Sequence, residues 1–122
     1  MDQESFNEKF RQRTKRLALE IIRIVAPLKY SDALSVLRKQ IIRSSTSVAS
    51  NFRAVCRGRS ERERFAKICI VVEEADETLF WLEMLKAADL ISPEHTDNIE
   101  QEATEILKVM SSYKRRFNHP TS

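Results

Sequence analysis

The scarcity of helix-breaking residues is the feature that most limits what this chain can fold into. Its 122 residues include a single glycine and three prolines. Folds built from many short strands need frequent turns, and turns rely mainly on glycine, proline and small polar residues. A chain with so few turn formers favours a handful of long helices in one domain. The hydrophobic content of 42% is sufficient for a substantial core.

The spacing of apolar residues predicts the first two helices. From residue 6 to 28 they recur at intervals of three, four and once seven, as on one face of an amphipathic helix, and Pro27 marks the end of this stretch. The second stretch has the same spacing from residue 34 to 55 and is interrupted at Gly58.

Capping signals mark the start of two further helices. Ser60 and Glu63 form an S-x-x-E capping box, from which a helix is expected to run to about residue 88 or 90. Ser92 and Pro93 provide an N-cap and a first helical residue, and apolar positions continue to Phe117. Short connections favour antiparallel neighbours. We therefore expect an all-α, antiparallel, up-down-up-down, left-handed four-helix bundle over residues 1–119, with a short tail at 120–122.

The middle of the second predicted helix is unusual because it reads RSSTSVASNF, residues 43–52. Serine, threonine and asparagine are poor helix formers, so another interaction should compensate for them. Small side chains allow close helix approach, and their hydroxyls can bond across the gap or to their own helix. We predict this role for Ser44, Ser47 and Asn51. The alternative is that the hydroxyls of Thr46, Ser47 and Ser50 face water.

The third predicted helix carries more apolar side chains than one core can bury. The run from Leu79 to Leu82 is continuously apolar, and Met84 and Leu85 follow. The types present include tryptophan and methionine, which are enriched at protein interfaces. We predict an interface between copies of the chain. Its expected residues are Phe80, Trp81, Met84 and Ile22. The alternative is a wide single-bundle core with a few exposed apolar residues.

Basic residues concentrate at one end of the predicted bundle. The net charge is only +3, but alternating helices bring the starts of the first and third and the ends of the second and fourth together. Fourteen basic groups and five acidic ones fall at that end, a surplus of +9. Helix dipoles explain cations near C-termini but not those near N-termini.

The cations near helix N-termini therefore suggest a polyanionic partner, contacted through its phosphates. The predicted nucleic-acid-binding residues are Arg11, Lys15, Arg53, Arg57, Arg59, Arg62, Arg64, Lys67, Arg115 and Arg116. Nearby aromatic residues occupy core positions, so base stacking is not expected. The alternative is that these cations are solvated surface that keeps the protein soluble.

Other function classes find little support in the sequence. No histidine or glycine-rich elbow accompanies the serines, and neither His95 nor His119 has a glutamate three residues earlier, as a di-iron bundle would require. The acidic residues between positions 73 and 77 are expected to pair with Arg38, Lys39 or Arg43. Cys56 and Cys69 suggest reduced thiols, and no signal peptide or membrane span is recognisable. We expect a cytoplasmic protein without catalytic residues, metal or cofactor.

The segment from Gln40 to Leu85 resembles a known bacterial family. The resemblance rests on a Q-x-x-R-S-x-T-S-x-x-x-N helix, an R-S start at Arg59 and Ser60, and the run EEADETLFWLEML. The chain is similar here to the proteins encoded in intervening sequences of 23S ribosomal RNA genes, described as four-helix-bundle proteins. It departs from many of them in residues 52–57, which read FRAVCR instead of carrying a glycine and acidic residues.

This resemblance implies a small four-helix bundle that assembles as a homopentamer and has no attached enzymatic activity. A related bundle assists a retroelement reverse transcriptase, which implies a nucleic-acid-binding or ribonucleoprotein accessory role. The expected function is thus that of a pentameric bundle that binds RNA or DNA through the basic end described above. The first alternative is a protein-interaction scaffold whose partner is another polypeptide, and the second is a metal-carboxylate enzyme.

Overall fold

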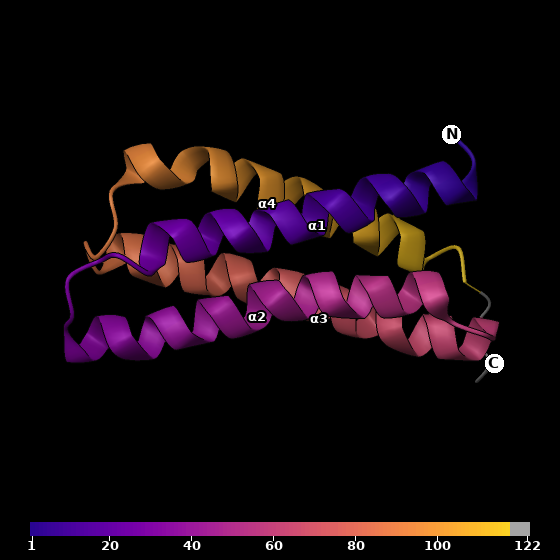
Figure 1. Cartoon of the computed structure of the whole chain (residues 1–122), viewed down its shortest axis with the longest axis horizontal. Coiled ribbons are helices and arrows are strands. Elements are labelled where there is room, and N and C mark those ends of the chain that lie inside the picture. Colours follow the sequence, from indigo (N-terminus) through magenta and orange to yellow (C-terminus); the bar gives the residue numbers. More distant parts are fainter. Residues whose placement is uncertain (118–122) are drawn as a thin grey trace.

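The chain folds into four long helices in the computed structural model, which describes residues 1–117. They are α1 (Gln3–Val25), α2 (Asp32–Arg57), α3 (Glu61–Ala87) and α4 (Pro93–Lys114), and the described residues contain no strand. The all-α prediction is confirmed. The connections lie at alternate ends of the molecule, so consecutive helices run in opposite directions (Figure 1). The left-handed twist stays a prediction, and the predicted tail at 120–122 lies outside the described residues.

Each helix begins at a side chain that accepts a hydrogen bond from a backbone amide of the first turn. This contact satisfies a donor that has no partner within the helix. The predicted caps at Ser60 and Ser92 are confirmed. The four pairs are Asp2 with the amide of Ser5 at 2.8 Å, Ser31 with Leu34 at 3.1 Å, Ser60 with Glu63 at 3.0 Å and Ser92 with Glu94 at 3.3 Å.

The end of α1 is fixed by a cation from the next helix. α1 ends at Val25, two residues before Pro27. The guanidinium of Arg38 lies 3.3 to 3.4 Å from the carbonyl oxygens of Val25, Ala26 and Leu28. These carbonyls would otherwise lack helical partners, and a positive charge is favourable at this end of the helix dipole. Arg38 therefore caps α1 and does not pair with the acidic cluster of α3.

The end of α3 is a left-handed turn. Asp89 has a φ of 57°, and the amide of Leu90 donates to the carbonyl of Leu85 at 3.0 Å. Aspartate tolerates this conformation better than most residues because its short polar side chain can bond locally. α3 consequently ends at Ala87, close to the predicted boundary.

The four helices form a closed arrangement in which each contacts its two neighbours. The contacts join α1 to α2, α2 to α3, α3 to α4 and α4 to α1, and they are most extensive between α2 and α3. The core contains side chains from all four helices, among them Ile21, Phe52, Ile68 and Met110, each at most 1% exposed. Their periodicity on each helix explains why one face of every helix is buried.

Small polar side chains lie where α2 meets α3. Ser44 and Thr78 are fully buried, and their hydroxyl oxygens are 2.9 Å apart across the two helices. Thr78 also bonds to the carbonyl of Glu74 at 2.8 Å. Among the described residues, no buried side-chain nitrogen or oxygen lacks a hydrogen-bond partner. The poor helix propensity here is thus offset by close packing and satisfied hydroxyls.

The remaining hydroxyl and amide side chains of this segment bond within α2. The Asn51 side-chain amide donates to both the carbonyl and the hydroxyl of Ser47, each at 2.9 Å. The exposed Thr46 and Ser50 hydroxyls donate to carbonyls of the preceding turn. Ser47 and Asn51 are half-buried, and their side chains bond to each other and not to α3. Their predicted role in close helix packing stays a prediction.

Ser44→Leu should lower the free energy of unfolding by about 2 kcal/mol, because a larger side chain overpacks the gap between α2 and α3. Urea denaturation monitored by circular dichroism measures this change. Ser112→Leu, at an exposed position of α4, is the matched control and should change stability by less than about 0.5 kcal/mol. Equal effects of both substitutions would contradict tight packing at Ser44.

Candidate nucleic-acid interface

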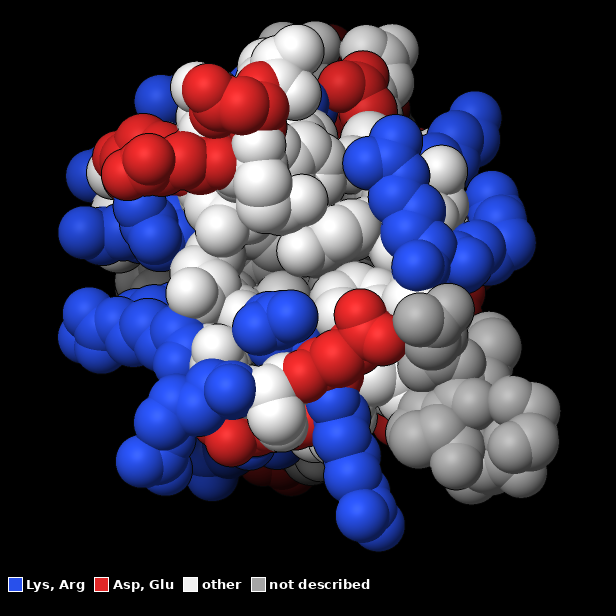
Figure 2. All heavy atoms as spheres, turned by 90° about the vertical axis from the view of Figure 1, so that its right-hand side faces the viewer, with Lys and Arg blue, Asp and Glu red and all other residues white. Residues whose placement is uncertain are grey.

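One end of the bundle gathers the chain segments that carry most of the basic residues. The start of α1, the end of α2, the start of α3 and the end of α4 all lie at this end (Figure 1). Seen end-on, Lys and Arg side chains line both sides of the face, around an uncharged centre with a few acidic side chains between them (Figure 2). We call this surface the basic pole.

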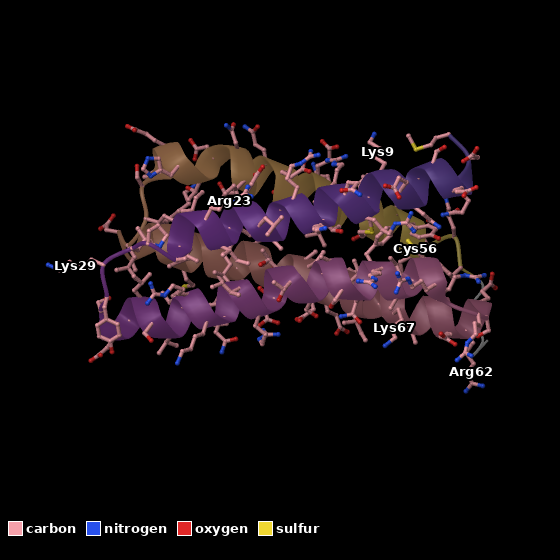
Figure 3. All side chains as sticks on the ribbon, in the orientation of Figure 1. Lys9, Arg23, Lys29, Cys56, Arg62 and Lys67 are labelled. Atoms are coloured by element: carbon pink, nitrogen blue, oxygen red, sulfur yellow. The ribbon has the colours of Figure 1, made fainter. Side chains whose placement is uncertain are left out.

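The structure separates the ten predicted binding residues into two groups. Seven belong to the end of α2, the start of α3 and the end of α4. These are Arg57, Arg59, Arg62, Arg64, Lys67, Arg115 and Arg116. Figure 3 shows Arg62 at the end of the bundle and Lys67 further along α3, whereas Lys29 lies at the opposite end. Arg64 and Lys67 are half-buried and the other five are exposed.

Arg64 is held in place by the turn between α2 and α3. Its guanidinium lies 3.3 Å from the carbonyl oxygen of Gly58. Gly58 has ordinary extended backbone angles, but a Cβ added there would overlap Cγ of Arg64. A side chain at position 58 would therefore displace Arg64 from its present position. Arg64 lines a pocket of about 330 Å³ at the pole, which Tyr113 and Arg116 also line.

The other group lies along the side of the bundle. Arg11, Lys15 and Arg53 line a groove of about 410 Å³ between α1 and α2. The small residues Ala18 and Ala49 also line it. Its remaining lining residues are Gln12, Leu19, Ile22, Thr46 and Ser50. The sequence places these three cations near the pole but could not show that they share this groove.

Ion pairs between α1 and α4 reduce the positive charge beside the pole. Arg13 makes two hydrogen bonds to Glu102, at 2.7 and 2.9 Å, and one to Glu105 at 2.8 Å. Fourteen basic and five acidic groups were counted at this end from the sequence, without these two glutamates. With them the acidic groups number seven, and the surplus of positive charge falls from +9 to +7. The hydrogen bonds from Arg13 hold the pKa of Glu102 below its ordinary value of 4.5. Arg11 pairs similarly with Glu8.

The acidic cluster of α3 pairs with α2. Arg43 contacts Glu74 at 2.9 Å and also bonds to Glu77. The indole N–H of Trp81 donates to Glu77 at 3.0 Å and is the main cause of the lowered pKa of that carboxyl. Among residues 1–117, no group of three or more histidine, cysteine or acidic side chains is arranged to hold a metal ion. His119 lies outside this range.

The four predicted interface residues occupy two different surfaces. Phe80 and Met84 are 47% and 39% exposed on α3, and Trp81 is half-buried with its ring 4.9 Å from that of Phe80. Ile22 instead lines the groove between α1 and α2, and none of the residues that line this groove belongs to α3. Sequence periodicity identified surplus apolar residues on both helices but did not separate the surfaces.

Two side chains that line the pole pocket, Cys56 and Tyr113, are uncharged at physiological pH. Burial raises the pKa of the Cys56 thiol and of the Tyr113 hydroxyl. The tyrosine oxygen accepts a hydrogen bond from Gln3 at 3.1 Å. A protonated thiol is a weak nucleophile. The pocket is also lined by Arg64, Arg116 and one acidic residue, Glu61, so its formal charge is positive because of the two arginines.

The family of the chain follows from its match to known proteins. The model of the 23S rRNA-intervening sequence proteins matches residues 7–112. The chain belongs to this family. It is also similar to a crystal structure from Bacteroides thetaiotaomicron, described as a protein of unknown function from the S23 ribosomal protein family. The TM-score is 0.81 at 29% sequence identity, covering 89% of this chain and 97% of the other.

No functionally curated protein matches this member of the family. Within the described residues, none of the helices combines the length and apolar character needed to cross a membrane. The family resemblance carried by residues 40–85 is thus confirmed over most of the chain. Nucleic-acid binding and pentamer formation stay predictions.

Glu102→Gln should lower the free energy of unfolding at pH 7 by about 1 to 2 kcal/mol, because it removes charge-assisted hydrogen bonds to Arg13. Since the folded-state pKa of Glu102 is lowered, this contribution is present above its ordinary pKa and is lost as pH falls through the folded value. Thermal unfolding from pH 7 to pH 3 should show wild type and variant converging. Glu105→Gln, with a side chain 60% exposed, is the control and should have a smaller effect. A difference that persists at pH 3 would contradict the assignment.

Proposed function

We propose that this 23S rRNA-intervening sequence protein is a non-enzymatic, homo-oligomeric bundle that binds RNA or DNA through its basic pole as a ribonucleoprotein accessory factor. The observation that carries the proposal is the gathering of cations from the end of α2, the start of α3 and the end of α4 at one end of the bundle (Figure 2). Phosphate contacts by such a surface give salt-dependent binding with little sequence preference.

Cations at the start of α3 support the proposal most directly. Arg62 and Arg64 lie in its first turn, and Arg59 precedes its cap residue. Positive charge at a helix N-terminus opposes the helix dipole and typically costs about 0.3 to 1 kcal/mol. The helix dipole therefore does not favour their charge there, whereas a polyanion bound at the pole would interact favourably with all three.

The mode of binding is expected to involve the backbone or the shape of the nucleic acid. Aromatic side chains near the pole pack against one another inside the bundle. The Phe6 ring lies 4.8 Å from that of Phe10 and 5.0 Å from that of Tyr113. Phe10 and Phe52 are at most 4% exposed. Bases need an exposed aromatic face on which to stack, whereas Phe10 and Phe52 are buried and Phe6 and Tyr113 are half-buried against neighbouring rings.

The proposal further takes the assembly to be a homopentamer of left-handed bundles whose poles point the same way, forming a basic ring. The family resemblance supports the number five. The expected location is the cytoplasm, where the unpaired Cys56 and Cys69 would remain reduced.

A second candidate function is a scaffold that binds another polypeptide. The exposure of Phe80 and Met84 favours it, because large apolar side chains gathered on a surface mark interaction sites. A metal-carboxylate enzyme is the weakest candidate, since Arg43 engages two carboxylates of the acidic cluster.

Arg57→Glu combined with Arg59→Glu should weaken binding to a structured RNA while leaving helicity and mass unchanged. Loss of two phosphate contacts should reduce the slope of log K against log salt by about 1.4 to 1.8. Fluorescence anisotropy over a salt series measures this slope.

The matched control is Lys29→Glu with Lys39→Glu, which makes the same charge change toward the opposite end of the bundle. The control should retain the wild-type slope. If both double variants lose affinity equally, net charge rather than the pole is responsible. Wild-type protein that ignores RNA at every salt concentration would favour the scaffold.

A further inference from the structure

The exposed side of α3 carries a second stripe of residues that the core does not use. Its members recur at intervals of four and three, so they lie along one line of the helix. They are Ala66, Ile70, Glu73, Glu77, Phe80 and Met84. The stripe is acidic around Glu73 and its neighbour Asp76, and apolar around Phe80 and Met84. Glu73 and Asp76 are exposed and make no ion pair in the described part of the chain.

The groove between α1 and α2 has the complementary composition in the same order. Along α1 it begins with Arg11 and Lys15 and continues with Leu19 and Ile22. Arg53 of α2 joins the basic half, since α2 runs antiparallel to α1. Leu19 is 39% exposed. The groove therefore has a basic half and an apolar half.

The two surfaces also agree in length. Met84 lies eleven positions after Glu73, and Ile22 lies eleven positions after Arg11, so each surface spans about 16 Å at the helical rise of 1.5 Å per residue. The small Ala18 and Ala49 beside the groove leave room for a large side chain such as Phe80 to enter.

We propose that the stripe on α3 of one copy of the chain docks in the α1–α2 groove of a second copy. Glu73 and Asp76 lie against Arg11, Lys15 and Arg53, and the apolar halves meet. The acidic-to-apolar order of α3 and the basic-to-apolar order of α1 both follow the chain direction, so docked α3 is parallel to α1. This inference rests on the self-association in the proposed function and identifies the surfaces that produce it.

Parallel docking fixes how the copies are related. α1 and α3 run the same way within one bundle (Figure 1), so neighbouring copies keep the same orientation. Because stripe and groove are different surfaces, the contact is heterologous and leads to a ring when the rotation closes. Every basic pole then lies on the same side of the ring. Arg11, Lys15 and Arg53 belong to the subunit interface, which leaves the seven cations of the pole for nucleic acid.

The test uses Leu19→Glu in the groove and Phe80→Glu in the stripe, with light scattering to measure mass in solution. Each variant disrupts one of the two surfaces and leaves the other intact. Because the oligomer needs both surfaces on every copy, neither variant alone should form it. Mixed together, they should form a one-to-one dimer, because the intact stripe of the first fits the intact groove of the second. Val36→Glu, at an exposed apolar position of α2 outside both surfaces, is the control and should retain the wild-type mass.

Charge reversal tests the orientation. Lys15→Glu with Arg53→Glu should dissociate the oligomer, as should Glu73→Lys with Asp76→Lys, and all four changes in one chain should restore it. An oligomeric wild type whose mass neither apolar variant alters would overturn this interface while self-association stands. A monomeric wild type would overturn both, and a mixture that fails to pair would overturn the heterologous contact.

Discussion

The close approach of α2 and α3 is the contact on which the rest of this structure depends. These two helices share the most extensive contact of the bundle, and the buried Ser44 and Thr78 hydroxyls meet at its centre. Larger side chains at these two positions would hold the helices apart. Small apolar side chains would allow the close approach but would remove the hydrogen bond between the two helices. Beside this contact, Arg43 joins α2 to Glu74 and Glu77 of α3. Only residues 58–60 connect the two helices, so the end of α2 and the start of α3 are fixed at the same pole.

Much of this architecture could be predicted from the sequence because it follows from local rules. Apolar periodicity identifies the buried face of each helix, and the side chains of Ser60 and Ser92 identify two starts. Periodicity also places Ser44 in the core, since it lies three residues after the buried Ile41 and four before the buried Val48. What the sequence lacks is the rotation of each helix relative to its neighbours. That rotation decides whether Ile22 shares a surface with Phe80, and the structure places them apart.

The electrostatic details were harder to predict for the same reason. Arg13 and Glu102 are 89 positions apart, and no spacing rule links such residues. Their pairing depends on the contact between α1 and α4, the least extensive contact between adjacent helices. A two-point hydrogen bond between guanidinium and carboxylate supplies directional bonding where apolar contact is limited. Because Arg13 is paired with Glu102 and Glu105, it adds little positive charge to the side of the bundle. The unpaired positive charge is therefore confined more closely to the end of the bundle.

The small area of this positive surface limits how strongly one bundle could bind a polyanion. Five of the seven cations of the pole are exposed and two are half-buried, and each phosphate contact is weakened strongly by salt. A single pole therefore offers modest affinity. Placing several poles on one side of an assembly raises affinity through effective concentration, without any new contact residue. The order of charged and apolar residues on α3 and in the α1–α2 groove would supply that common orientation. In the proposed function, self-association would thus strengthen nucleic-acid binding, although the two would use different residues.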